Sequence, residues 1–154
     1  MRLLPYVVTL VFALLCVHMK SVKGELLGDY IGAENCAKCH VEIAASWAKT
    51  PHAKAFESLK KEGKDTTPGC MKCHSVAYGK DGGFIDMELT HELAGVQCES
   101  CHGPGLKHQD SEDPAHIIRN SKKEVCRTCH TLGQDANFDF FKKVKKVHPV
   151  KEPK

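Results

Sequence analysis

Eight of the nine cysteines in this 154-residue chain lie in four copies of one motif, in which two residues separate two cysteines and a histidine follows directly. A pair of thiols at this spacing can add to the two vinyl groups of one haem, and the adjacent imidazole can bind the iron. The sequence therefore predicts four covalently attached c-type haems. The attachment cysteines are Cys36, Cys39, Cys70, Cys73, Cys98, Cys101, Cys126 and Cys129, and the proximal histidines are His40, His74, His102 and His130.

Three other uses of paired cysteines compete with haem attachment. The eight thiols could form two zinc sites of four thiolates each, or four disulfides in a secreted domain. A single pair could also act as a thioredoxin-like redox couple. None of these uses explains why a histidine follows every pair, so haem attachment is favoured.

The remaining histidines are candidates for the second axial position on each iron. After the predicted signal segment, five histidines lie outside the motifs: His52, His91, His108, His116 and His148. We expect His52, His108 and His148 to be distal ligands, with His91 and His116 as weaker candidates. Methionine is the other common axial ligand, and Met87 is the weak alternative of that type.

The distances along the chain predict that distal ligands cross between haem units. His108 lies six residues after His102, and it would have to pass around the edge of a porphyrin to meet the same iron. A neighbouring iron is easier to reach. The same argument holds for His52, which lies twelve residues after His40.

The second motif is expected to be the exception, because three strong distal candidates serve four irons. The segment that follows it, residues 78–84, is rich in glycine and contains no histidine. Phe84 could cover the iron without binding it. We expect an open, five-coordinate haem on His74. The alternatives are that His91 or His116 binds this iron as the distal ligand.

The N-terminus predicts export. An uncharged apolar run at residues 3–17 follows Arg2 and fits the hydrophobic part of a secretory signal. We place the signal peptide at residues 1–24, which removes Cys16, and the haem domain at 25–154. An uncleaved membrane anchor is the alternative. The periplasm is the expected location, and an extracellular or membrane-anchored protein is the other option.

Net charge gives no support for nucleic-acid binding. The whole chain carries a formal charge of +3, but the signal segment supplies three of its 22 basic residues and no acidic residue. The mature chain is therefore neutral, with 19 residues of each sign. Four haems would make it acidic, because their propionates outnumber the ferric charges. One basic cluster could then serve as a docking patch for redox partners, and the alternative is that it is only a solvated helix face. Its members are Lys142, Lys143, Lys145 and Lys146.

The predicted fold is mostly α, with short helices and loops wrapped around packed haems. A mature chain with about 32 residues per haem cannot bury a conventional core. Helices are expected at residues 41–49 and 52–61, and a helix start is expected at Thr67-Pro68. Residues 81–83 predict a turn, and residues 103–105 a break. Phe138, Phe141, Val144 and His148 fall close to one helical stripe.

Beyond the motifs, residues 30–56, 93–108 and 138–149 resemble the tetrahaem cytochrome c-554 family. The segment CESCHGPG at 98–105 is also similar to a haem-packing motif of hydroxylamine oxidoreductase and the multihaem nitrite reductases. The resemblance implies a mostly helical fold, closely paired haems, mostly bis-histidine iron and electron transfer. It matches His52 and His108 to distal-ligand positions and His148 to a recurrent C-terminal His-Pro, whereas His91 matches less well. It also implies a five-coordinate haem on the second motif.

Two classes of function follow from these features. The first is an electron carrier between redox proteins, with low reduction potentials that follow from bis-histidine ligation. The second is a haem enzyme that acts on a nitrogen oxide or peroxide at an open iron. Every motif here ends in histidine rather than the lysine of a nitrite reductase haem, which favours the carrier. A membrane-associated oxidoreductase is one candidate partner, and self-assembly into an oligomer or filament is another option.

Overall fold

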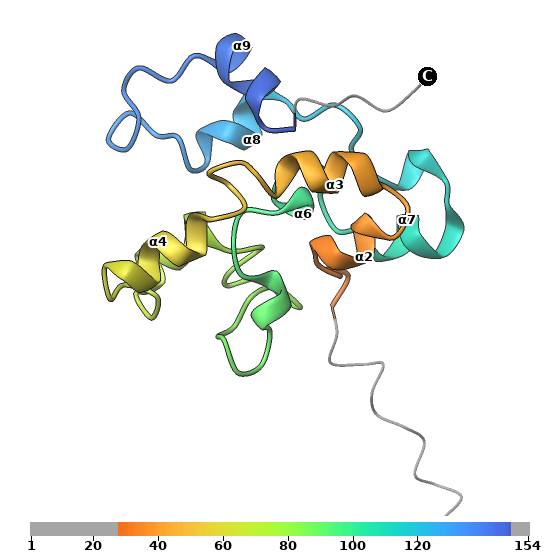
Figure 1. The fold of residues 1–154 in the computed structure, drawn as a ribbon, viewed down its shortest axis with the longest axis horizontal. Coiled ribbons are helices and arrows are strands. Elements are labelled where there is room, and N and C mark those ends of the chain that lie inside the picture. The colour runs from red at the N-terminus through yellow and green to blue at the C-terminus, as the bar shows by residue number, and fades with distance from the viewer. Residues whose placement is uncertain (1–27, 149–154) are drawn as a thin grey trace, which may run out of the picture.

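The computed structural model describes residues 28–148. The predicted signal segment, with Cys16, lies outside the described residues. The described chain is a succession of short helices joined by turns and loops (Figure 1). The α-helices are α2 (Ala33–Ala37), α3 (Val41–Trp47), α4 (Ala55–Lys61), α5 (Pro68–His74), α6 (Cys98–His102), α7 (Leu106–Ser111), α8 (Lys123–Arg127) and α9 (Phe140–Lys143). The 3₁₀ helices are η2 (His91–Leu93), η3 (Pro114–His116) and η4 (Val144–Lys146).

The mostly helical fold that the sequence predicted is confirmed. Within residues 28–148, extended pairing is limited to an isolated antiparallel bridge between Ser75 and Ala94. Of the helices in this range, none is long and apolar enough to cross a membrane.

The helix starts follow the predicted proline positions only in part. Helix α3 begins at Val41 as expected and ends two residues early. Helix α5 begins at Pro68, where the missing N–H costs nothing and the fixed φ suits the first turn. The helix expected from His52 begins instead at Ala55, because residues 51–54 form a turn in which Lys54 donates to the carbonyl of Pro51 at 3.2 Å.

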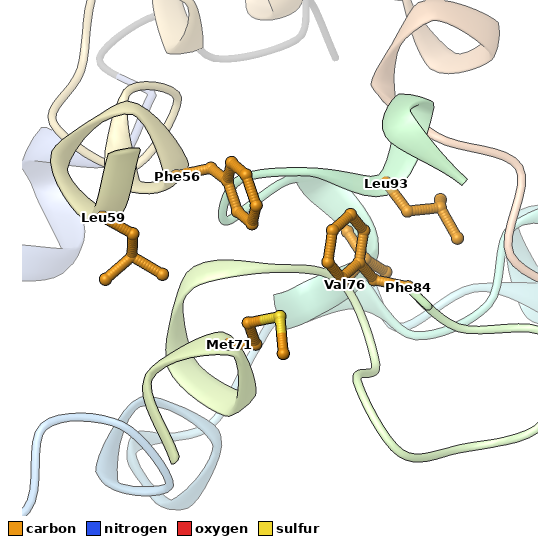
Figure 2. Packing of buried hydrophobic residues seen from close by; sticks show 6 residues of the cluster. All are labelled: Phe56, Leu59, Met71, Val76, Phe84 and Leu93. Atoms are coloured by element: carbon orange, nitrogen blue, oxygen red, sulfur yellow. The ribbon is translucent and has the colours of Figure 1, made fainter. Parts of the chain in front are cut away.

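The apolar core of the described chain surrounds the second motif (Figure 2). Its aromatic centre is an edge-to-face pair, Phe56 and Phe84, with ring centroids 5.1 Å apart. Phe84 thus packs inside the apolar cluster. The six members come from α4, α5, the 76–84 segment and η2, and are Phe56, Leu59, Met71, Val76, Phe84 and Leu93.

The segment after α5 folds back as a compact loop. The Phe84 N–H donates to the carbonyl of Val76 at 2.8 Å, and the Val76 N–H donates to that of Leu93 at 2.9 Å. The turn predicted at residues 81–83 is present. A Cβ on Gly83 would lie 2.1 Å from the carbonyl oxygen of Ala77, so the backbone approaches too closely there for any side chain.

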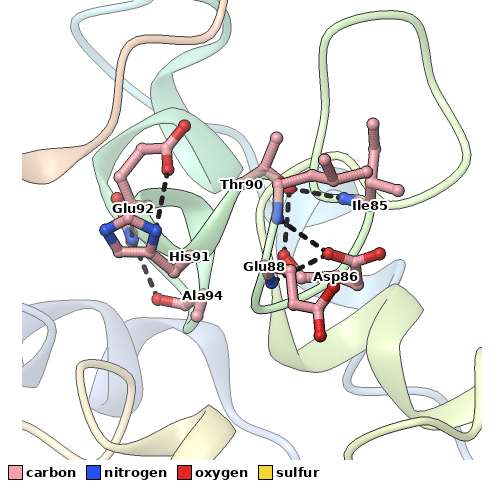
Figure 3. A network of polar contacts seen from close by, with 9 residues as sticks. Ile85, Asp86, Glu88, Thr90, His91, Glu92 and Ala94 are labelled. Atoms are coloured by element: carbon pink, nitrogen blue, oxygen red, sulfur yellow. Dashed lines mark hydrogen bonds and ion pairs between the residues drawn. The ribbon is translucent and has the colours of Figure 1, made fainter.

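Residues 85–90 are held by local side-chain hydrogen bonds (Figure 3). The Asp86 carboxylate accepts from the N–H groups of Glu88 at 2.9 Å and Leu89 at 2.8 Å. The Thr90 hydroxyl accepts from the N–H of Ile85 at 2.7 Å. These bonds order the loop that leads into η2.

The single helical stripe predicted near the C-terminus is wrong. The Asp139 side chain caps α9 by accepting from the N–H of Lys142 at 3.2 Å, so the helix begins after Phe138. Phe138 is 8% exposed, whereas Phe141 is 77% exposed. The two rings therefore lie in different environments.

Candidate functional site

Each of the four motifs lies on a short helix or on the turn that ends one. The second motif lies in α5 and the third fills α6. In the first and fourth motifs the helix holds the first cysteine, and the histidine N–H reaches back to it. His40 donates to the carbonyl of Cys36, and His130 to that of Cys126, each at 2.9 Å. The two thiols of a motif are therefore separated by about one helical turn.

Three of the four motif histidines face a histidine from elsewhere in the chain. The rings of His40 and His108 lie nearly parallel, with centroids 6.2 Å apart and an interplanar angle of 21°. His102 and His148 are 6.1 Å apart at 29°, and His130 and His52 are 6.1 Å apart at 60°. Each of the distal candidates His52, His108 and His148 thus lies opposite a proximal histidine that is distant from it in the sequence.

These separations fit one metal ion between each pair of rings. A metal–imidazole nitrogen bond is about 2 Å long and the ring centre lies about 1 Å further out, so two opposed ligands have centroids about 6 Å apart. Each of the three pairs could therefore hold one haem iron.

Hydrogen bonds fix the tautomer of several of these rings. Nδ1 of His102 donates to the Ile118 carbonyl at 2.5 Å, and Nδ1 of His108 donates to the Asp113 carbonyl at 2.9 Å. A ring that donates from Nδ1 leaves the lone pair of Nε2 available for a metal. The carbonyl groups that accept from His102 and His108 therefore leave both rings oriented for iron binding.

The surroundings of His52 favour its neutral form, which is the form that binds a metal. Burial, and then the neighbouring imidazole of His130, lower its pKa. The turn at residues 51–54 presents His52 from the connection between α3 and α4. The His52 carbonyl also accepts from the Val96 N–H at 3.2 Å, which fixes this turn against the segment before the third motif.

The second motif is arranged differently. His74 donates from Nδ1 to the Ala55 carbonyl at 2.7 Å, which leaves its Nε2 available. Within residues 28–148, no ring contact joins His74 to a second histidine. The His91 side chain is 69% exposed and lies 3.7 Å from Glu92, and His116 contacts the Ser111 hydroxyl at 2.7 Å. The structure brings neither weaker candidate to a motif histidine.

Thiols from different motifs lie next to one another. The Cys98 thiol hydrogen-bonds Cys36, which raises the pKa of Cys36 and lowers that of Cys98. Burial, and then the nearby Cys129 thiol, raise the pKa of Cys73 to about 11. The first motif therefore adjoins the third, and the second adjoins the fourth.

The third and fourth motifs also adjoin. Burial, and then Cys126 and Cys129, raise the pKa of Cys101 to about 11. A depression of 690 Å³ lies along the segment that connects these two motifs in the chain, lined by Ile118, Asn120, Lys122, Glu124 and Val125.

The zinc and disulfide alternatives gain no support from these positions. All eight motif cysteines are free thiols. Among residues 28–148, no group of three or more histidine, cysteine or acidic side chains converges on a point that could hold a metal by itself. Each motif carries its own two thiols within four residues, as attachment to one porphyrin requires.

Comparison with known proteins decides the family. The family model described as "Cytochrome c554 and c-prime" matches residues 35–103. Cytochrome c-554 of Nitrosomonas europaea is 34% identical over 125 residues, which cover 70% of this chain and 53% of that protein.

The chain belongs to the cytochrome c554 family. It is a multihaem c-type cytochrome, and it spans about half the length of the curated relative that it matches. The solved structure of the reduced state of cytochrome c554 from Nitrosomonas europaea matches with a TM-score of 0.58 and 29% identity, over 77% of this chain and 83% of that one. The fold and the family predicted from the sequence are thus confirmed.

Two buried side chains that sequence reasoning missed join the first and third motifs. Glu99 is 4% exposed, and its carboxylate accepts from the N–H groups of Ile31 at 3.0 Å, Gly32 at 2.9 Å and Gly105 at 2.8 Å. The Gln97 side chain accepts from the Ala33 N–H at 2.6 Å. The sequence signal that could have indicated a role for Glu99 was the position of its carboxylate between the two cysteines of a haem attachment motif.

The basic residues near the C-terminus lie on the surface. Lys142 pairs with Asp139 at 3.4 Å, and Lys143 lies 3.8 Å from Asp135. Lys145 and Lys146 are exposed on η4. The predicted basic patch is therefore accessible, and two of its four members are partly neutralised by acidic neighbours.

Proposed function

We propose that this chain is a tetrahaem electron carrier, exported and processed near residue 24, that exchanges electrons with redox proteins. Membership of a multihaem cytochrome family supports the class of function. The number of haems rests on the four attachment motifs. Haem, when bound, supplies iron that alternates between the ferric and ferrous states.

The observation that carries this proposal is the set of three opposed histidine pairs. We infer that His40 and His108, His102 and His148, and His130 and His52 each hold one iron. Two imidazoles give low-spin iron with a low reduction potential, which suits outer-sphere electron exchange without ligand changes.

The order of the attachment sites supports a single row. Thiols of the first and third motifs are neighbours, as are those of the third and fourth and those of the fourth and second, which supports a row in that order. We infer that electrons enter and leave at opposite ends of this row. The end formed by the second motif lies against the apolar core.

A second candidate function follows from His74, which faces no histidine among the described residues. We infer that its iron is five-coordinate and can bind a small molecule such as nitric oxide. The site adjoins the apolar cluster, of which Met71 on the same helix is a member. The site therefore supports ligand binding as an addition to electron transfer.

Intact-mass measurement and EPR of the ferric protein test the proposal together. The mass should equal residues 25–154 plus four haems. Three low-spin signals and one high-spin signal are expected. One low-spin signal should differ from the other two, because the tilted rings of His52 and His130 give a different ligand field from the near-parallel pairs.

Single substitutions then assign the signals. His108→Ala should convert the low-spin signal of the His40 site to high spin and leave the tilted-pair signal unchanged, whereas His52→Ala should do the reverse. Haem that extracts into organic solvent would refute covalent attachment. Four low-spin signals would refute an open second site.

A further inference from the structure

The hydrogen bond on Nδ1 of His130 differs in kind from those of the other well-defined ligand candidates. His130 lies 3.0 Å from the Asp135 carboxylate. His74 and His102 instead donate to the backbone carbonyls of Ala55 and Ile118. A carboxylate is a stronger acceptor than a neutral carbonyl, so it polarises the His130 imidazole more strongly.

The loop after the fourth motif is built to hold this carboxylate in place. The Asp135 N–H donates to the Thr131 carbonyl at 2.8 Å, and its carbonyl accepts from the Phe138 N–H at 3.1 Å. The side chains of His130 and Asp135 are 32% and 25% exposed, so solvent only partly screens their interaction.

The ring of His130 is also fixed from its other side. Phe138 stacks on it with centroids 4.5 Å apart and an interplanar angle of 23°. The Arg127 guanidinium donates to the carbonyls of His130 at 2.8 Å and Phe138 at 3.3 Å, and it lies over the Phe138 ring at 4.9 Å. The contacts with Asp135, Phe138 and Arg127 thus fix the orientation of the His130 ring.

We propose that Asp135 is a positioning residue that lowers the reduction potential of the iron bound by His130 and His52. A more strongly polarised imidazole donates more charge to the metal and favours the ferric state, in which the iron carries one more positive charge. The negative carboxylate favours the same state by Coulomb attraction. One-electron reduction of this iron therefore becomes less favourable.

Lys143 moderates this effect. Its ammonium lies 3.8 Å from the same Asp135 oxygen and is 53% exposed. A cation beside the carboxylate withdraws part of its negative charge from His130. Removal of the Lys143 charge should thus lower the potential further, and removal of the Asp135 charge should raise it.

The test is a spectroelectrochemical titration of the haem-loaded protein, with the four one-electron steps followed optically and by EPR. Asp135→Asn should raise the potential of the haem that gives the tilted-pair signal, with a tenfold change in its ferric–ferrous equilibrium for each 59 mV. Asp135→Glu should restore a low value. Lys143→Met should move the same step downward.

Matched variants separate the hydrogen bond from general charge. Asp139→Asn removes the same charge from the cap of α9, and Lys142→Met removes the paired cation, which is 83% exposed. Both should shift the step less than their counterparts at 135 and 143. Equal shifts in Asp135→Asn and Asp139→Asn would overturn the proposal, as would no shift in Asp135→Asn.

The inference rests on the proposed ligation of iron by His130. Two variants distinguish a failure of the role of Asp135 from a failure of the ligand assignment. If Asp135→Asn retains four haems by mass and the tilted-pair signal by EPR, an unchanged potential refutes only the role of Asp135. If the signal persists in His52→Ala, the ligand assignment itself is wrong.

Discussion

At the scale of single residues, the least expected feature is a carboxylate buried between the cysteines of the third motif. Glu99 accepts three backbone N–H groups from two segments, residues 31–32 and Gly105. A Cβ on Gly105 would lie 3.1 Å from its oxygen, so the glycine allows this close approach. Glu99 therefore fixes the chain before the first motif against the third.

Glu99→Gln should destabilise the protein, because the amide NH₂ would face N–H donors and leave at least one of them unsatisfied. We expect a loss of about 2 kcal/mol, measured as a lower midpoint of guanidinium unfolding of the haem-loaded protein. The control is Glu57→Gln, whose side chain is 62% exposed and forms an ion pair with Lys60. Equal midpoints for the two variants would contradict the buried role of Glu99.

Two histidines that the sequence left open give a second prediction at this scale. His91 is exposed beside Glu92, and His116 lies against Ser111. His91→Ala and His116→Ala should therefore leave every ferric EPR signal unchanged, including the high-spin one. Loss of a low-spin signal in either variant would identify that histidine as a ligand and remove the open second site.

At the scale of elements, the helices are too short to be stable alone, and the loops between them set their positions. The 76–84 loop carries Val76 and Phe84 into the apolar cluster beside α5 (Figure 2). Its backbone passes Ala77 so closely that only glycine fits at position 83.

Gly83→Ala should lower the unfolding midpoint, because the new methyl group would overlap the Ala77 backbone and displace Phe84. Gly69→Ala is the matched control: its Cβ meets nothing within 4 Å, and it lies in α5. That change should stabilise the protein by about 0.5–1 kcal/mol, since alanine loses less backbone entropy in a helix. Thermal unfolding followed at the haem absorbance compares the two, and the same direction of change in both would refute the close approach.

At the scale of the whole molecule, cofactor loading should reverse the sign of the charge. The mature chain has equal numbers of basic and acidic residues. Four haems would bring it to about −4 when ferric and about −8 when ferrous. The protein should therefore bind an anion exchanger at pH 7, and reduction of the same sample should increase its mobility toward the anode. Retention on a cation exchanger would contradict the proposed haem number.

Some properties were decided by sequence alone because they are local. The two thiols and the imidazole of each attachment site lie within five consecutive residues, so a short helical turn is enough to arrange them. The mostly helical fold and the starts of α3 and α5 followed from similarly local signals. So did the family.

Other properties were decided only by the tertiary structure. Which histidine faces which motif depends on how distant segments pack: His108 meets His40, and His148 meets His102. Sequence distance excluded some pairings but could not select one. Glu99 and Asp135 read as ordinary surface acids until packing brought backbone amides to one and the His130 ring to the other. Their roles arise from neighbours that no local pattern specifies.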